Sequence, residues 1–253
     1  MRDTLAGQPA VFMDAIDSTN AEAQRRIRAG ALAAPLWFVA CRQEKGKGRH
    51  GRAWHSPEGN LYASLATPAP AAPLAAAQTS FAVAIALAET LERQGAPAIA
   101  CKWPNDVLCC GRKLAGILLE RVSDPQGQPW LIVGIGVNIA SAPADDAVTW
   151  PAIALADLDV AASDAGALAE SLAQRLAHWR ARLAREGFAP LRAAWMQRAY
   201  GMGTRTRVKR GDGVIEGQFL GLDETGAARL RLDSGPETLV HAGEIMFARA
   251  KDA

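Results

Sequence analysis

The sequence predicts an α+β fold, with a mixed β-sheet flanked by helices and followed by a small β-barrel. Apolar runs typical of strands alternate with helical segments over residues 1–200, without the regular rhythm of a doubly wound sheet. A long amphipathic pattern occupies residues 165–187. From residue 201 onward, short β segments separated by glycine-containing turns replace the helices. We therefore expect one domain over residues 1–200 and a second over 201–253.

Two helices are expected in the first hundred residues of the chain. Residues 17–20 precede a helix that ends near Gly30, and Thr19 with Glu22 fits a capping box. A loop rich in alanine and proline over residues 66–77 leads into the second helix, which glycine and proline end after about Leu91.

Short apolar runs predict the strands of the main sheet. They cover residues 36–40, 60–65, 99–103, 107–108, 114–120 and 130–139. The turn at residues 110–112 joins two of them in a hairpin. Gly134 and Gly136 lie inside the last run, and a glycine within a strand often marks the close approach of a ligand or another segment.

The helix over residues 165–187 is the clearest helical pattern in the sequence. Its apolar residues recur every three or four positions and form one stripe: Leu168, Leu172, Leu176, Trp179 and Leu183. A shorter helix is expected over residues 190–200. Both helices should cover the sheet.

Composition is that of an ordinary soluble globular protein. The 253 residues are 49% hydrophobic and 21% charged, and the net charge of +2 argues against a surface that coats polyanions. The four cysteines lack metal-binding spacing, so we expect free thiols in a reducing cytoplasm. We expect neither a signal peptide nor a membrane span.

The most informative segment is a basic loop over residues 42–54. Residues 42–52 hold five Lys or Arg and three Gly. Glycine amides and nearby cations form concave anion sites. The loop is not a Walker A motif, since Lys47 is followed by Gly48. On composition it predicts a phosphate or carboxylate site, with a solvated loop or a nucleic-acid patch as alternatives.

Three other polar segments could carry chemistry. Residues 18–20 are either a plain helix N-cap or a helix start that binds an acceptor-rich ligand. Residues 102–106, Lys-Trp-Pro-Asn-Asp, are either an ordinary turn or a source of Mg²⁺ or ribose ligands. Lys113 opens an apolar strand and points either into a site or into solvent.

Together these segments resemble the biotin protein ligase family. The family pattern appears here in order as Ser18-Thr19-Asn20, Gly46 to Arg52, Lys102 to Asp106, Lys113 to Leu118 and Gly134 to Asn138. The C-terminal module also resembles the SH3-like domain of that family. One departure is Lys47, which stands where the family usually has Arg and keeps the charge without the bidentate fork.

The resemblance implies a class II synthetase-like catalytic domain that uses ATP, Mg²⁺ and biotin. Biotin would be activated to biotinyl-5′-adenylate and then transferred to a lysine of the biotin carboxyl carrier protein of acetyl-CoA carboxylase. Only 16 residues precede Asp17, too few for an N-terminal helix-turn-helix, so the resemblance is to the monofunctional type. It implies a cytoplasmic enzyme and leaves homodimerisation open.

The resemblance also assigns site residues by position. Biotin or its adenylate would contact Ser18, Thr19, Asn20, Gln43, Lys47, Gly48, Arg49 and Lys113. The nucleotide would contact Arg52, Trp54, Lys102, Asn105 and Asn138, and Asp106 would bind the metal. The catalytic pair would be Lys113, which stabilises charge on the acyl phosphate, and Arg49, on a loop that closes over the adenylate.

Two other functions are alternatives to biotin protein ligation. A lipoate-type protein ligase shares the chemistry, but its Gly-Gly-Gly motif is absent from this sequence and residues 102–106 favour biotin. A non-catalytic biotin- or nucleic-acid-binding module, such as a biotin-responsive repressor, is the second alternative. The near-neutral charge disfavours it, and we expect no sequence-specific DNA binding and no membrane partner.

Overall fold

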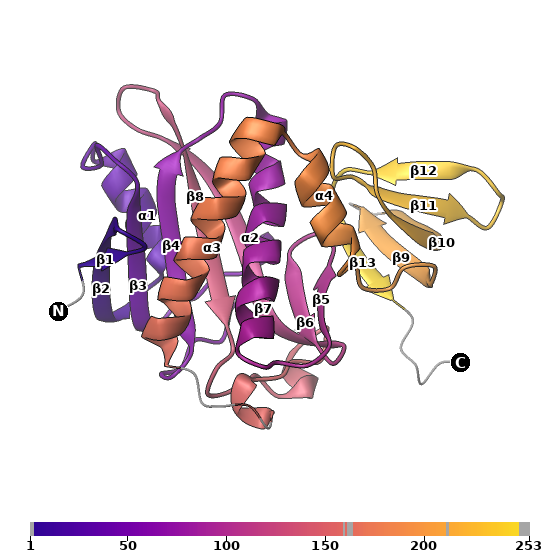
Figure 1. Cartoon of the computed structure of the whole chain (residues 1–253), viewed down its shortest axis with the longest axis horizontal. Helices are drawn as coiled ribbons and strands as arrows, with labels where there is room; N and C mark the ends of the chain where they lie inside the picture. The colour runs from indigo at the N-terminus through magenta and orange to yellow at the C-terminus, as the bar shows by residue number, and fades with distance from the viewer. Residues whose placement is uncertain (1–2, 159, 161–163, 211–212, 248–253) are drawn as a thin grey trace.

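A computed structural model describes residues 3–158, 160, 164–210 and 213–247. They form an eight-stranded mixed sheet with helices on both faces and a five-stranded antiparallel sheet beside it (Figure 1). The predicted α+β architecture is confirmed. The last six residues of the predicted second domain, 248–253, lie outside the described residues.

The large sheet has the strand order β1-β2-β3-β4-β8-β7-β6-β5. In chain order the strands are β1 (Thr4–Leu5), β2 (Gln8–Ile16), β3 (Leu36–Gln43), β4 (Leu61–Pro68), β5 (Ile99–Lys102), β6 (Asp106–Cys109), β7 (Arg112–Ser123) and β8 (Pro129–Val137). β2 and β3 pair in parallel, and the other neighbours pair antiparallel. The predicted strands are present; four of the six are longer than predicted by two to five residues, and β5 and β8 are each one residue shorter.

Strands β1 and β2 were not predicted from the sequence. β2 lies near the edge of the sheet, where many of its side chains are only partly buried, so the two-residue alternation of a strand is weak. Helix α1 (Thr19–Arg28) follows β2 and returns the chain to β3. This βαβ unit places the start of α1 and the end of β3 side by side.

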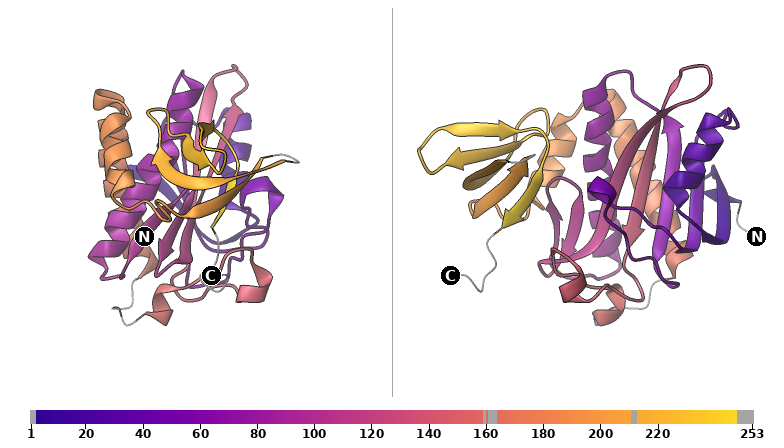
Figure 2. Two further views of the ribbon diagram at one scale, coloured as in Figure 1. Left: turned by 90° about the vertical axis from the view of Figure 1, so that its right-hand side faces the viewer. Right: turned by 180° about the vertical axis from the view of Figure 1, so that it is seen from behind.

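The two faces of the sheet carry different helices (Figures 1 and 2). Helices α2 (Pro73–Arg93) and α3 (Ala165–Glu186) cover one face over the main core. α2 is long and apolar enough to cross a membrane, but 72% of its most apolar window is buried inside the protein. α1 packs on the opposite face, where Ile27 meets Phe38 and Trp130.

The second sheet follows helix α4 (Ala189–Met196) and has the strand order β12-β11-β10-β9-β13. Its strands are β9 (Arg205–Arg210), β10 (Gly213–Leu222), β11 (Ala228–Leu232), β12 (Glu237–Val240) and β13 (Glu244–Phe247). Phe247 packs edge-on against Tyr200 and Trp150, and Trp103 Nε1 donates to Gly226 O at 3.1 Å. The two sheets therefore share one hydrophobic core.

Three single-turn 3₁₀ helices complete the described structure, η1 (Arg49–Gly51), η2 (Asp145–Ala147) and η3 (Leu155–Asp157). η1 lies at the tip of the basic loop. The right-hand view of Figure 2 shows this loop crossing the face of the sheet that also carries α1.

Candidate functional site

The start of α1 gathers polar side chains that are buried. Ser18, Thr19 and Asn20 are only 3–4% exposed. Gln43 Oε1, at the end of β3, accepts from the Thr19 N–H at 2.8 Å and lies 3.1 Å from Thr19 Oγ1. Gln43 Nε2 donates to Ser56 Oγ at 3.0 Å. The parallel β2–β3 pairing thus brings together four of the residues that were predicted to contact biotin or its adenylate.

The predicted capping box of Thr19 and Glu22 does not form. The N-cap is Ser18, whose side chain makes no capping bond. Glu22 pairs with Arg25 and Arg26 on the outer side of the helix. The Thr19 hydroxyl faces Gln43 and Ser64. The prediction was wrong because Thr19 bonds to residues of β3 and β4 and Glu22 to arginines of α1, so neither side chain caps the start of the helix.

The basic loop folds back on itself as a narrow hairpin. The Trp54 N–H donates to Gly46 O at 2.9 Å, and Lys47 takes part in an antiparallel bridge across the loop. The turn η1 forms its tip. The loop leaves β3 beside α1 and extends toward β6 and β7, where Arg49 bonds Asn105 and Trp54 contacts Lys113.

Trp54 lies flat against two glycines of the central strands. A β-carbon on Gly136 would be 2.6 Å from the indole ring, and one on Gly116 would be 2.9 Å from it. Gly134 meets Asn20 in the same way. The expected close approaches at Gly134 and Gly136 are therefore contacts with Asn20 and Trp54. The indole Nε1 is buried and has no hydrogen-bond partner among the described residues.

Lys102, at the end of β5, Asp106, at the start of β6, and Lys113, near the start of β7, form a compact charge cluster. Asp106 Oδ1 lies 2.7 Å from Lys113 Nζ, and its Oδ2 lies 3.5 Å from Lys102 Nζ. Lys113 Nζ also lies 5.1 Å from the centroid of the Trp54 ring. Burial opposes ionisation of Asp106, but the two lysines prevail and hold its pKa below the ordinary value. The cluster carries more positive than negative charge and suits an anionic ligand.

The surroundings of Asp106 do not fit the metal role that was predicted for it. Both carboxylate oxygens face lysine ammonium groups, which repel a divalent cation. Across the described residues, no group of three or more His, Cys, Asp or Glu side chains is placed to hold a metal ion. We therefore derive no step through a protein-bound Mg²⁺ at this position.

Arg49 connects the basic loop to both sheets. Its guanidinium donates to Asn105 Oδ1 at 3.2 Å and to Gly243 O at 3.1 Å. Asn105 in turn donates to Ile117 O at 2.8 Å. The tip of the loop is thereby held across the turn before β6 and against the second sheet.

The remaining predicted residues lie around this centre and differ in their contacts. Lys47 is exposed on the loop, and the Gly48 N–H donates to a backbone oxygen within it. Arg52 reaches Thr149 Oγ1 at 3.2 Å. Asn138 is buried, and its Nδ2 donates to Ile153 O at 3.2 Å and to Lys113 O at 3.4 Å. Asn138 thus holds the backbone around Lys113.

Sequence reasoning missed three residues that complete the site. Ser56 hydrogen-bonds the side chain of Gln43, and Ser64 hydrogen-bonds those of Thr19 and Asn20. Glu120 hydrogen-bonds the side chain of Asn20. A polar residue inside an apolar strand run could have identified Ser64 and Glu120. Such a position demands a buried partner.

The two buried thiols are unsuited to act as nucleophiles. All four cysteines are free, and burial raises the pKa of Cys101 and of Cys109 to about 12. Both are therefore protonated at neutral pH.

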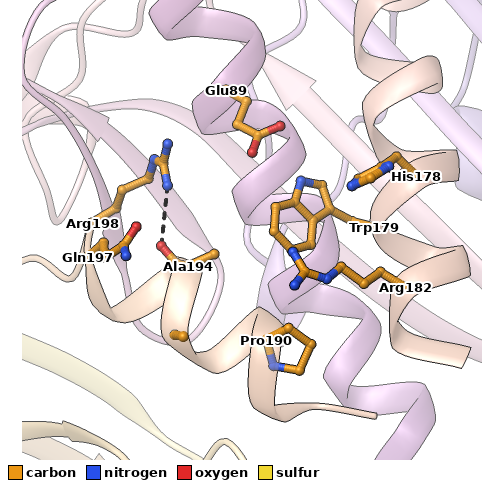
Figure 3. Close-up of a pocket in the computed structure, with 9 residues that line it drawn as sticks. Glu89, His178, Trp179, Arg182, Pro190, Ala194, Gln197 and Arg198 are labelled. Atoms are coloured by element: carbon orange, nitrogen blue, oxygen red, sulfur yellow. Dashed lines mark hydrogen bonds between the residues drawn. The ribbon is translucent and has the colours of Figure 1, made fainter. Parts of the chain in front are cut away.

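Two hollows lie at the surface. One, of about 400 Å³, runs along the basic loop and is lined by residues 42–46 and 53–57. The other, of about 510 Å³, lies between α2, α3 and α4, where Glu89, Trp179 and Arg182 face one another (Figure 3). The second hollow contains none of the predicted site residues, and we assign it no part in the reaction.

Comparison with known proteins gives consistent matches. Residues 12–138 match the model of the biotin/lipoate A/B protein ligase family, and residues 201–247 match that of the biotin protein ligase C-terminal domain. The biotin–[acetyl-CoA-carboxylase] ligase of Paracoccus denitrificans is 40% identical over 91% of this chain and 97% of its own length. The bifunctional ligase/repressor BirA of Escherichia coli is 33% identical, over 90% of this chain and 71% of its own length.

A solved structure gives the same fold. The biotin protein ligase of Aquifex aeolicus, in complex with biotin and ATP, has a TM-score of 0.81 and is 26% identical, over 95% of this chain and 99% of its own.

Proposed function

The chain belongs to the biotin protein ligase family, and from this premise we propose that it activates biotin with ATP and biotinylates a carrier protein. The acceptor is a lysine of the carboxyl carrier subunit of acetyl-CoA carboxylase. The convergence of the four motif segments on one face of the sheet supports this proposal most strongly. The basic loop connects the segments: Trp54 contacts Lys113, Arg49 bonds Asn105, and Gln43 at its start bonds Thr19 of α1.

In the first half-reaction, a biotin carboxylate oxygen attacks the α-phosphorus of ATP and pyrophosphate leaves. Two anions must approach each other, so cations are needed where they meet. Lys113 donates to the carboxylate and stabilises charge on the forming acyl phosphate, while Lys102 faces the phosphates. Asp106 touches both lysines and holds their ammonium groups in place.

In the second half-reaction, the amine of the carrier lysine attacks the acyl carbon and AMP leaves. Lys113 stabilises the departing phosphate. The basic loop covers the anhydride and keeps water from it, with Arg49 as its anchor on Asn105 and Gly243. Arg52 and Trp54 lie on the nucleotide side, with Asn105 and the backbone that Asn138 holds.

Mg²⁺ would be bound together with the nucleotide. In nucleotide sites the ion is held largely by substrate phosphates and water. We propose no ligand for it at Asp106.

The proposal extends to the domain boundary, the cellular location, DNA binding and the oligomeric state of the protein. We place the boundary between a catalytic domain and a C-terminal SH3-like domain at residues 200 and 201. We propose a cytoplasmic enzyme that does not bind a specific DNA sequence, and homodimerisation is a further hypothesis. A gel shift at physiological salt and sedimentation analysis test the last two points.

The proposed function is tested by transfer of labelled biotin to a biotin carboxyl carrier domain. The domain should be labelled only when ATP is present and only on its acceptor lysine, and a Lys→Arg variant of that lysine is the matched control. Labelling with lipoate in place of biotin would support the lipoate ligase alternative. Absence of labelling with either acid would contradict enzymatic function.

A further inference from the structure

Glu120 closes a continuous chain of hydrogen bonds behind the start of α1. Its Oε2 accepts from Asn20 Nδ2 at 2.6 Å, and its Oε1 accepts from Gln24 Nε2 at 2.9 Å. Ser64 Oγ lies 2.5 Å from Asn20 Oδ1 and 2.7 Å from Thr19 Oγ1. The chain therefore joins a carboxylate on β7 to the hydroxyl of Thr19.

The direction of these bonds follows from what each group can donate. A carboxylate only accepts, so Asn20 turns its NH₂ to Glu120 and its Oδ1 to Ser64. A carbonyl oxygen cannot donate, so the single hydroxyl hydrogen of Ser64 lies on Asn20. The Ser64 oxygen then accepts, and the hydroxyl hydrogen of Thr19 points toward it.

This direction leaves Thr19 Oγ1 as a hydrogen-bond acceptor on its other side. Gln43 Oε1 also lies 3.1 Å from Thr19 Oγ1, but it already accepts from the Thr19 N–H at 2.8 Å, and the hydroxyl hydrogen is needed in the shorter 2.7 Å contact with Ser64 Oγ. A free acceptor at this point suits the N–H groups of a cyclic urea such as the one in biotin.

Glu120 excludes the opposite direction. If the Asn20 amide were turned over, its carbonyl oxygen would face the carboxylate and two acceptors would meet. Ser64 would then receive a hydrogen from Asn20 and give its own to Thr19, whose hydroxyl hydrogen would turn to Gln43 Oε1 or to a ligand. Ser64 is 0% exposed, so solvent cannot compensate for a mismatched direction.

We propose that Glu120 is a positioning residue for biotin recognition. Acting through Asn20 and Ser64, it fixes Thr19 as an acceptor for a ureido N–H. The inference rests on the proposed function, which places Thr19 against biotin.

The variant Glu120→Gln tests the proposal because it keeps the shape but can meet Asn20 in either orientation. We expect the Kd for biotin, measured by isothermal titration calorimetry, to rise about tenfold, the scale of one hydrogen bond. The KM for ATP and the melting temperature should change little. Glu120→Asp, which keeps an acceptor-only group, should recover part of the affinity. Glu22→Gln, on the outer side of α1, is the matched control and should bind biotin as the wild type does.

A double-mutant cycle with Thr19→Val separates positioning from general support. Thr19→Val should weaken biotin binding, and adding Glu120→Gln should then cause no further loss. A further tenfold loss in the Thr19→Val background, or wild-type affinity in Glu120→Gln alone, would overturn the proposal. Wild-type affinity in Thr19→Val would instead remove Thr19 from the biotin site and defeat the assignment on which the proposal rests.

Discussion

Asp106 is the residue on which the two site lysines depend. It is 8% exposed and lies between their ammonium groups. In Asp106→Asn the lysines lose their counter-charge, and we expect a loss of about 3 kcal/mol in the free energy of unfolding at pH 7, the cost of breaking a buried ion pair. Urea unfolding measures it, with Asp14→Asn, at an exposed position of β2, as the control.

The same residue makes stability depend on pH in the acid range. Because the pKa of Asp106 is lowered in the folded protein, its contribution is complete above the ordinary value of 3.8 and is lost as pH falls through the folded pKa. The difference in unfolding free energy between wild type and Asp106→Asn should therefore shrink below about pH 4. A difference that stays constant from pH 6 to pH 3 would contradict the ion pairing.

At the scale of elements, the glycines of β7 and β8 form the surface on which the basic loop rests. In Gly136→Ala the new methyl group collides with the Trp54 ring, so the loop must shift. We expect adenylate formation to slow on the order of 10²-fold, the scale of a small misplacement in an active site. In a Trp54→Ala background the same substitution should cause no further loss, and an equal loss there would refute the contact.

The basic loop should also change its dynamics when the ligand binds. Its five cations repel one another, and a bound adenylate supplies the opposite charge. Amide hydrogen exchange of residues 44–54 should slow when biotinyl-adenylate is added, and equal exchange with and without it would count against a closing loop.

Loss of the arginine that anchors the loop should release the adenylate. Arg49→Gly breaks the bonds to Asn105 and Gly243, so we expect free biotinyl-adenylate and biotinylation of bystander lysines. Lys45→Gly, on the exposed part of the loop, is the control and should retain the adenylate. Blotting bystander protein for biotin distinguishes the two variants. Identical blots would contradict the role of the loop in retaining the adenylate.

For the whole molecule, the shared core predicts that both sheets unfold together. Phe247 of the second sheet is 7% exposed and packs against Tyr200, Trp150 and Phe219. Urea unfolding should show one transition, and Phe247→Ala should lower the unfolding free energy by about 3 kcal/mol. Two separate transitions in the wild type would argue against a continuous core.

Most of the fold could be predicted from local patterns, and the site only from combined motifs. The helices α2 and α3 have long apolar patterns that few other structures satisfy. β2 was missed because partial burial at the sheet edge weakens its alternation. Glu120, Ser56 and Ser64 escaped because their roles depend on which strands become neighbours. The contacts of Thr19 and Asp106 depend on neighbours that spacing in the sequence does not reveal.

The central claim is that the motif residues form one site that adenylates biotin, with Lys113 at its centre. ATP–pyrophosphate exchange measures this step directly in wild type and in Lys113→Ala, each with biotin, with lipoate and with neither acid. We predict exchange with biotin alone, and a rate on the order of 10²–10³ lower in Lys113→Ala, the usual effect of removing one electrostatic stabiliser. Comparable exchange with lipoate, or a wild-type rate in Lys113→Ala, would contradict the claim.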